Sequence, residues 1–386
     1  MISFAKSVDL ILKSADSNIN TMSKDGEVVS MLNGNVVFLY DDATIKSQYA
    51  KWWKSKGVVS FSDHVNVVRT KQTMTSDKMD YDKNKKQLIA EGHMVFNDFK
   101  EHVRIAGNRG IYNMDTKFLV VEGKPHFEFF DSTAHDTVDI TGVKMTYSDS
   151  LKKAVVQQAV RIKKGKLVTH SDMAIYFPDS GKAHLREVPQ IAFETDSLFG
   201  DSVDLLFTKN KLQKVKVRGS SHGLYRDFGT KDTTLTQLFG DSLSMFMSDS
   251  GRIDSLYATG NVKSKYAPIQ KPKQTNEAYG KYMMVSFNKK NQIERVRVWG
   301  NAQSIYNVEE KDGRGMNDAS GDSIRVSFAN GKAANVRMSG SVRGYYAPLP
   351  SEAKKDQKQT GDIIEKPSAD SLSKKTSPDK AKEEKK

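Results

Sequence analysis

The chain has 386 residues, a net charge of +13 and no cysteine. The absence of cysteine excludes disulfides, thiolate metal sites and cysteine nucleophiles. Hydrophobic residues make up 37% of the chain, which is low for a thick globular core and suits a thin, elongated β-structure. The positive charge fits a nucleic acid, anionic lipid or acidic glycan partner, or a lysine-rich solvated surface.

The first residues carry no apolar stretch of the length of a signal peptide or a membrane-spanning helix. The longest apolar run there is Leu10-Ile11-Leu12. Residues 32–38 read LNGNVVF, which matches the closing half of a repeat followed by another strand. We therefore expect the array to begin with an incomplete unit, as terminal caps of repeat proteins do.

A repeated hairpin pattern organises the chain, and residues 240–262 show it most clearly. They read GDSLSMFMSDSGRIDSLYATGNV, with two alternating segments around a Ser-Asp-Ser-Gly turn. Period-two alternation joined by turn residues predicts a β-hairpin. Copies recur about every 30 to 40 residues, which predicts stacked units that bury their faces against one another. The units open at Ser47, Ser76, Gly107, Gly142, Ser171, Gly200, Gly240, Gly280 and Gly321.

The fourth and sixth residues of each unit, with matching positions of the closing strands, form one face of the array. The sixth position is aromatic in the units up to residue 176 and aliphatic in the units after residue 200. This face either lines a hydrophobic groove or forms a dry core between two layers, and we predict the groove. The predicted groove residues are Trp52, Met79, Tyr81, Tyr112, Met145, Tyr147, Tyr176, Val203, Leu205, Leu243, Met245, Met283, Val285, Val296, Val298, Ile324, Val326 and Met338.

The repeat length and the face chemistry change near residue 195. We predict two sub-arrays, residues 1–194 and 195–350, which stack without a linker. In the second sub-array, longer loops each follow a tyrosine: Tyr225, Tyr266 and Tyr306. Residues 351–386 lack aromatic side chains and alternation and are rich in Lys, Glu and Ser, so we predict a disordered tail.

The polar residues form no recognisable catalytic or metal-binding constellation. The histidines are scattered, and His93 follows a repeat-closing glycine, which predicts a turn residue. Asp98 and Glu101 could pair as glycosidase carboxylates do, and acids cluster at 309–312, but such surface acids are usually solvated. We predict no catalytic residue, no metal site and no cofactor. Nucleic acid is not a predicted partner, because the repeat tyrosines share a face with Met and Ala instead of alternating with Arg.

The whole frame, an opening Gly/Ser-Asp strand, a turn, a hydrophobic strand and Gly-Asn-Val, resembles the OstA/LptA family of periplasmic lipopolysaccharide-transport bridge proteins. It is carried by residues 32–36, by 76–82 with 91–94, and by 259–262. The resemblance covers roughly residues 10–345 and looks like a duplicated OstA-like version. It implies an all-β array of antiparallel hairpins, with two sheets in an open V (a β-jellyroll) that holds acyl chains. It also implies export to the periplasm, so we expect a leader before residue 1.

These observations together predict a non-enzymatic lipid carrier or bridge in lipopolysaccharide transport to the outer membrane. Each acyl methylene moved from water into an apolar trough contributes ~0.8 kcal/mol. The open terminal strands would pair with inner- and outer-membrane transport components, or head to tail with further copies. The alternative is an extracytoplasmic repeat-β module that binds or cleaves acidic glycan. The basic residues expected at the trough rim, where they would meet phosphates and acidic sugars, are Lys163, Lys164, Lys166, Arg218 and Arg297.

Overall fold

The structure is a computed structural model. It describes residues 10–130, 137–148, 150–208, 211–228, 233–270, 274–310, 313–329 and 332–349. All of them belong to one compact unit, Met1–Leu349. The described residues form strands and turns and no helix, so none of them forms a helix able to cross a membrane. The predicted tail, residues 351–386, lies outside the described residues.

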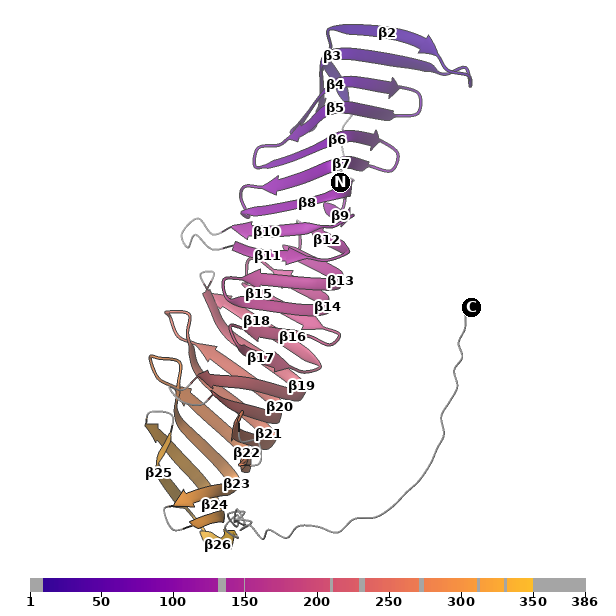
Figure 1. The fold of residues 1–386 in the computed structure, drawn as a ribbon. Helices are drawn as coiled ribbons and strands as arrows, with labels where there is room; N and C mark the ends of the chain where they lie inside the picture. The colour runs from indigo at the N-terminus through magenta and orange to yellow at the C-terminus, as the bar shows by residue number, and fades with distance from the viewer. Residues whose placement is uncertain are drawn as a thin grey trace, which may run out of the picture. The chain divides into compact units, whose positions relative to one another are not determined.

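The strands follow one another along the array in the order of the sequence, apart from local exchanges (Figure 1). The first are β1 (Ile11–Ser14), β2 (Ser17–Met22), β3 (Val28–Tyr40), β4 (Ala43–Trp53), β5 (Val58–Val68), β6 (Gln72–Asp82), β7 (Gln87–Asp98), β8 (Val103–Asn113), β9 (Phe118–Glu122), β10 (His126–Phe130), β11 (Thr137–Thr141), β12 (Lys144–Ser148) and β13 (Lys153–Lys164). The others are β14 (Leu167–Phe177), β15 (Lys182–Arg186), β16 (Gln190–Phe193), β17 (Asp196–Phe199), β18 (Ser202–Thr208), β19 (Lys211–Phe228), β20 (Thr233–Met247), β21 (Ile253–Pro268), β22 (Asn276–Phe287), β23 (Ile293–Glu310), β24 (Gly313–Ala329), β25 (Lys332–Ser339) and β26 (Arg343–Leu349).

Two layers arise because each long strand crosses from one to the other at a bulge. Between β3 and β4, for example, the register shifts between Asn33 and Val36. We call the layer that contains β2, β9, β12, β15, β18 and β25 layer A, and the layer that contains β1, β10, β11, β16, β17 and β26 layer B. The long strands contribute one half to each layer. The predicted all-β antiparallel array is confirmed, and its two layers are halves of one continuous sheet.

Each long strand bends where it passes from one layer to the other, and we call this bend a corner. The corners explain the Gly/Ser-Asp and Gly-Asn motifs. Gly34 and Asn35 both have positive φ, 74° and 48°, which turns the strand at the bulge. A Cβ on Gly34 would lie 2.2 Å from Oδ2 of Asp16, so this position requires glycine. The Asn35 amide in turn donates to Asp16 Oδ2 at 2.9 Å. The Asp that precedes one strand therefore accepts a hydrogen bond from the corner of the following strand.

His93 occupies the same corner position, as predicted from the sequence. It follows Gly92, has a positive φ of 44°, and its Nδ1 lies 2.8 Å from Oδ2 of Asp77. The histidine thus takes the place that asparagine has at Asn35, Asn261 and Asn301. His93 lies within β7, so it bends a strand at its bulge and does not belong to a turn between strands.

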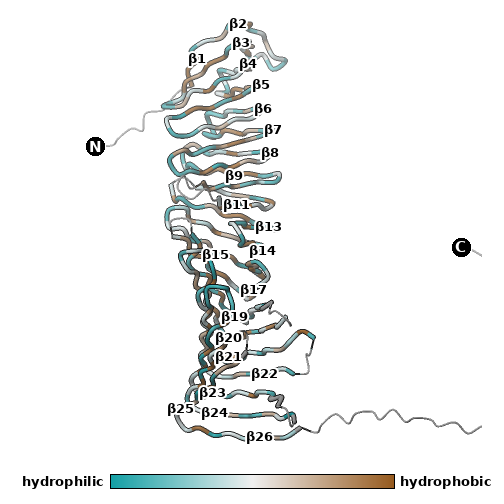
Figure 2. Tube along the Cα trace, turned by 60° about the vertical axis from the view of Figure 1, so that its left-hand side comes forward, coloured by the Kyte–Doolittle hydropathy of each residue, from teal (hydrophilic) through white to brown (hydrophobic). Residues whose placement is uncertain are grey.

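In the first half of the array, large side chains from the two layers pack against each other. Figure 2 traces the stacked strands, with hydrophobic and hydrophilic residues interspersed along them. Phe127 of layer B lies 5.8 Å from Tyr176 and 6.3 Å from Tyr147, measured between ring centroids. Phe38 of layer B meets Phe61 of layer A edge-on at 5.3 Å. All five rings are almost completely buried. The two layers of this half are therefore closely packed against each other.

Strand pairing continues through residue 195, where the two sub-arrays were predicted to meet. Gln190–Phe193 pairs with Asp196–Phe199, and β17 pairs with β19. The continuous ladder agrees with the expectation that no linker separates the parts. The division into sub-arrays at 194 and 195 stays a prediction.

Candidate functional site

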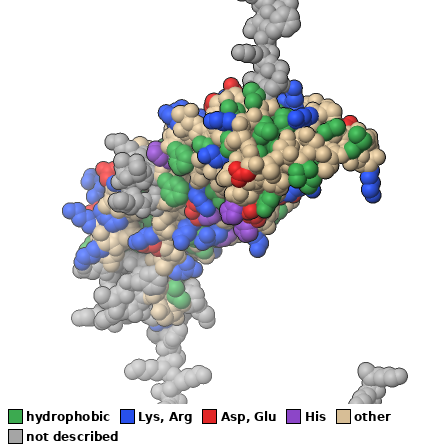
Figure 3. Space-filling view, turned by 90° about the horizontal axis from the view of Figure 1, so that it is seen from above, with side chains coloured by type: hydrophobic (Ala, Val, Ile, Leu, Met, Phe, Trp, Pro, Cys, Tyr) green, Lys and Arg blue, Asp and Glu red, His purple; other side chains and the backbone are tan. Residues whose placement is uncertain are grey.

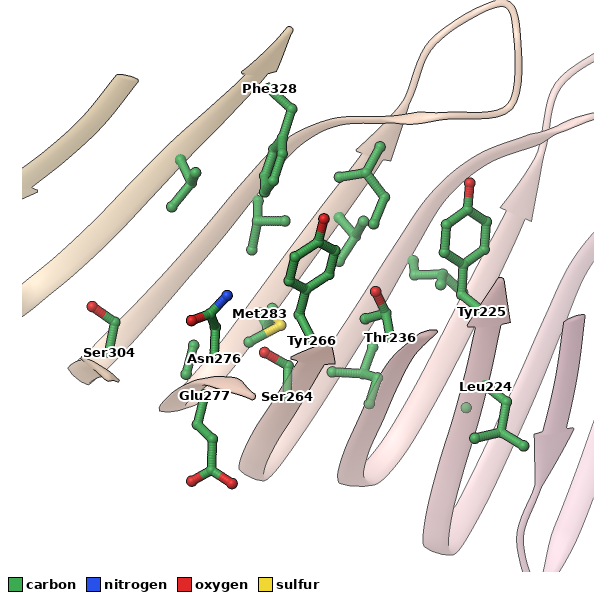
Figure 4. Close-up of a pocket in the computed structure, with 18 of the residues that line it drawn as sticks. Leu224, Tyr225, Thr236, Ser264, Tyr266, Asn276, Glu277, Met283, Ser304 and Phe328 are labelled. Atoms are coloured by element: carbon green, nitrogen blue, oxygen red, sulfur yellow. The ribbon is translucent and has the colours of Figure 1, made fainter. Parts of the chain in front are cut away.

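In the second half of the array the layers enclose a cavity of about 1050 Å³ (Figure 4). The closed first half has a small cavity of about 40 Å³, lined by residues from β3 to just after β8. The larger volume lies at the upper end of the range typical of ligand sites. The two halves share one fold, so the difference between them must come from side chains.

The side chain four residues after each corner glycine explains why one half is closed and the other is hollow. This position points inward from layer B. In the first half it is phenylalanine, at Phe38, Phe96 and Phe127, and these rings fill the space between the layers. In the second half it is Gly223, Ser264, Ser304 and Gly344, of which all but the last line the cavity. The loss of each aromatic ring leaves the space that the cavity occupies.

Layer A supplies the apolar wall of the cavity, and part of the predicted groove set lies there. Figure 4 shows Met283 among the lining side chains. The lining also includes residues that the sequence reasoning did not select, such as Ile253, Leu256 and Phe287. The predicted residues that line the cavity are Leu243, Met245, Met283, Val285, Val296, Val326 and Met338.

The other predicted groove residues do not line this cavity. Trp52 is partly buried and packs edge-on against Phe38 at 5.3 Å. Tyr112 lines the small cavity of the first half. The rest are buried between the layers: Met79, Tyr81, Met145, Tyr147, Tyr176, Val203, Leu205, Val298 and Ile324. A role of any of these residues in lipid binding stays a prediction.

Layer B supplies most of the polar side chains of the cavity wall, which the sequence reasoning missed. Figure 4 shows Thr236, Ser264, Asn276 and Ser304 with Tyr225 and Tyr266 around the cavity. The alignment of the repeats compared only strand halves that belong to layer A. In the sequence, the change from phenylalanine to Gly or Ser four residues after the corner glycine could have revealed this wall.

Asp196, at the start of β17, is the buried carboxylate of the cavity wall. Only 9% of its surface is exposed, and Oδ1 accepts the backbone N–H of Arg226 at 3.1 Å. Burial raises the pKa of this carboxyl to about 6, and the nearby charge of Glu194 adds to the rise. Glu277 also borders the cavity but pairs with Lys263 at 3.3 Å. No described lining residue is Lys or Arg.

The structure does not bring the predicted rim bases to the cavity. Strand parity places Arg218 and Arg297 on the outer face of layer A, where Arg218 pairs with Asp204 and Arg297 lies 5.0 Å from the Trp299 ring. Lys163, Lys164 and Lys166 lie at the turn between β13 and β14, and Lys164 is 6% exposed. Figure 3 shows Lys and Arg side chains spread over the face in view. Contact of these bases with phosphates stays a prediction.

One histidine–carboxylate cluster appears that the sequence did not reveal. The pairing of β10 with β11 places His126 Nε2 2.6 Å from Oδ2 of Asp139, with Glu128 beside them. Arg104 donates to Glu128 at 2.7 Å, so this carboxylate already has a cationic partner. We assign the cluster a structural role on the outer face of layer B.

The acid pair considered for glycosidase chemistry also has a structural explanation. Asp98 is buried, and its Oδ1 accepts the backbone N–H groups of Lys100 and Glu101 at 3.0 Å, which fixes a turn. Glu101 itself pairs with Lys152 at 3.2 Å. The other acid cluster, at 309–312, falls outside the described side chains.

Each layer ends in strands that pair on one side only. At the first end these are β1 and β2, both bonded to β3, and at the other end β25 and β26, both bonded to β24. Several apolar side chains there are exposed, including Met22 at 74% and Tyr345 at 68%. Open strands of this kind can accept a further strand from another chain.

The corners, the continuous antiparallel ladder and the cavity define a β-repeat protein with an internal ligand-sized space. Residues 44–150 match the family model described as LptA/(LptD N-terminal domain) LPS transport protein, so the resemblance to the OstA/LptA family is confirmed. The crystal structure of LptH, the LptA homologous periplasmic component of the lipopolysaccharide transport device of Pseudomonas aeruginosa, is also similar. It has 13% identity and a TM-score of 0.26, over 28% of this chain and 76% of LptH. Comparison with curated proteins found no match.

Proposed function

We propose that this protein is a non-enzymatic lipid carrier or bridge in lipopolysaccharide transport to the outer membrane, acting in the periplasm. The match of residues 44–150 to the transport family supports the pathway. The cavity of about 1050 Å³ between the layers is the observation that carries the lipid-binding role. The cavity lies outside the matched segment, so the family resemblance and the cavity are independent arguments.

Acyl chains would lie against the apolar wall of layer A. Met245 and Met283 are unbranched and flexible, so they pack around chains of irregular shape. At ~0.8 kcal/mol for each methylene removed from water, even a short buried segment gives substantial binding without a directional bond. Hydrophobic enclosure alone can therefore hold the lipid.

The open terminal strands would connect the protein to its transport partners. A strand of a neighbouring component would add to β1 and β2, or to β25 and β26, through main-chain hydrogen bonds. The same geometry would allow head-to-tail association of two copies. Either arrangement would extend both layers beyond one molecule.

A lipid cross-linking experiment tests the carrier role. A photoreactive amino acid at Met245 or Met283 should cross-link to lipopolysaccharide in cells, whereas one at Met79, in the closed half, should not. Mass spectrometry of an organic extract of the purified protein should recover the same lipid. Equal labelling at Met79 and Met283, or no lipid in the extract, would refute the proposal. Cleavage of an acidic polysaccharide would support the alternative module.

A further inference from the structure

A row of tyrosines alternating with small polar residues crosses the inner face of layer B in the second half. The strand register aligns Tyr225 with Thr236, Thr236 with Tyr266, and Tyr266 with Asn276. The same row continues from Tyr306 to Asn317 and Tyr346. We call these residues the tyrosine row. The sequence showed three of the tyrosines only as residues that precede loops.

The neighbouring row, closer to the corner, consists mostly of small side chains. It contains Gly223, Leu238, Ser264, Ala278, Ser304 and Ala319. These residues leave room in front of the polar groups of the tyrosine row, which face the apolar wall of layer A across the cavity (Figure 4). The layer A wall of the cavity is therefore apolar, and the layer B wall combines hydrogen-bonding side chains with apolar ones such as Phe193, Leu198 and Leu238.

Thr236 is a residue of the layer B wall whose hydroxyl is not used in a hydrogen bond within the described structure. Its Oγ1 is buried and has no hydrogen-bond partner among the described residues. A buried hydroxyl without a partner destabilises a protein, and such groups in native structures call for an explanation such as a bound ligand. Thr236 lines the cavity, so a rotation about its Cα–Cβ bond would turn this hydroxyl toward a ligand there.

The wall is also held in place by hydrogen bonds and a ring contact of its own side chains. The Asn276 Oδ1 accepts the backbone N–H of Asn307 at 2.8 Å. The Tyr225 hydroxyl donates to the carbonyl of Asn291, in the β22–β23 turn of layer A, and its ring meets Phe287 at 5.0 Å. A fixed polar wall binds its ligand with a smaller loss of conformational entropy.

We propose that the tyrosine row binds the uncharged, oxygen-bearing part of an amphipathic lipid, while layer A binds its hydrocarbon. Hydroxyl, ester and amide groups are the matching chemistry. Phosphate and carboxylate groups remain outside, because no described lining residue is Lys or Arg and Asp196 would repel an anion. This inference rests on the proposed carrier function and names its lipid class.

Two uncharged probes with the same chains test the inference. N-Hexadecylhexadecanamide carries an amide between two chains, and dihexadecyl ether carries an ether oxygen at the same place. Binding of each to the full chain is measured by displacement of a fluorescent fatty acid. One added hydrogen bond to the ligand is worth roughly two- to tenfold in affinity. The protein should therefore bind the amide about fivefold more tightly than the ether.

The Thr236→Val variant removes the hydroxyl and keeps the shape of the side chain. It should lower the affinity for the amide by about fivefold and the affinity for the ether less, because an ether oxygen is a weaker acceptor than an amide carbonyl and carries no N–H. Thr169→Val is the matched control, because Thr169 also has a buried hydroxyl without a partner among the described residues but lies in the closed half. It should change neither affinity. Both variants should raise the melting temperature of the lipid-free protein.

The outcomes separate this inference from the proposed function. Equal affinity of the unmodified protein for amide and ether, or a Thr236→Val variant that loses both probes equally, would overturn the role of the tyrosine row and leave the carrier function standing. Failure of both probes to bind, with no lipid in the organic extract, would refute the carrier function itself.

Discussion

Asp196→Asn should stabilise the protein in a way that depends on pH. The buried carboxyl has its pKa raised from 3.8 to about 6, so the folded state holds a proton that the unfolded state releases. Below about pH 4 both states are protonated and the residue has no net effect. Between about pH 4 and pH 6 the stability falls as the pH rises, and above pH 6 the full cost is present. Two units at about 1.4 kcal/mol each give about 3 kcal/mol.

The variant removes this cost because an amide does not ionise, while its oxygen can still accept the Arg226 N–H. Thermal unfolding at about pH 7.5 should show a melting temperature several degrees higher than that of the unmodified protein, and at about pH 4 the two should agree. Asp249→Asn, at an exposed turn, controls for the loss of one negative charge. An equal gain at both pH values, or no gain at about pH 7.5, would refute the argument from burial.

The remaining predictions concern the cavity, a corner and the closed core. Ser304→Phe should fill the cavity and reduce lipid binding at least tenfold in a displacement assay without unfolding the protein, since the first half accommodates phenylalanine at this position. Gly260→Ala should cost more than 2 kcal/mol by urea unfolding, because its Cβ would lie 2.0 Å from Asp241 Oδ2, whereas Gly251→Ala, with open space around it, should cost about 1 kcal/mol. Phe127→Ala should destabilise the closed half by about 3–5 kcal/mol, and an unchanged urea midpoint would contradict the packing described for it.

The sequence predicts the hairpin array well because its information is local. Period-two alternation assigns the inward face of each strand in layer A, as at Met79 and Tyr81, without knowledge of any distant contact. The corner motifs are equally local, since Gly34 and Asn35 need positive φ and the sequence shows the residues that tolerate it. The positions of the strands, and which of their side chains point inward, can therefore be predicted from residues that are close together in the sequence.

The location of the cavity could not be read from the same alternation. Met79 and Met283 occupy equivalent inward positions and are both buried, yet Met79 is packed in the closed half and Met283 lines the cavity. The difference lies in the residue across the gap, which belongs to layer B and is contributed by another strand. Asp196 is similar, because its burial depends on the strands around it and on the bond from Arg226, more than twenty positions away.

The corner design makes the length of the closed half independent of the cavity. Each strand bonds only to its immediate neighbours, and each corner is completed by the adjacent strand, so β6 and β7 make no contact with the strands of the cavity. Removing or adding one pair of strands there would change the reach of the protein by about 10 Å and leave the ligand chamber as it is. Evolution can therefore adjust the length of the array separately from the lining of the cavity.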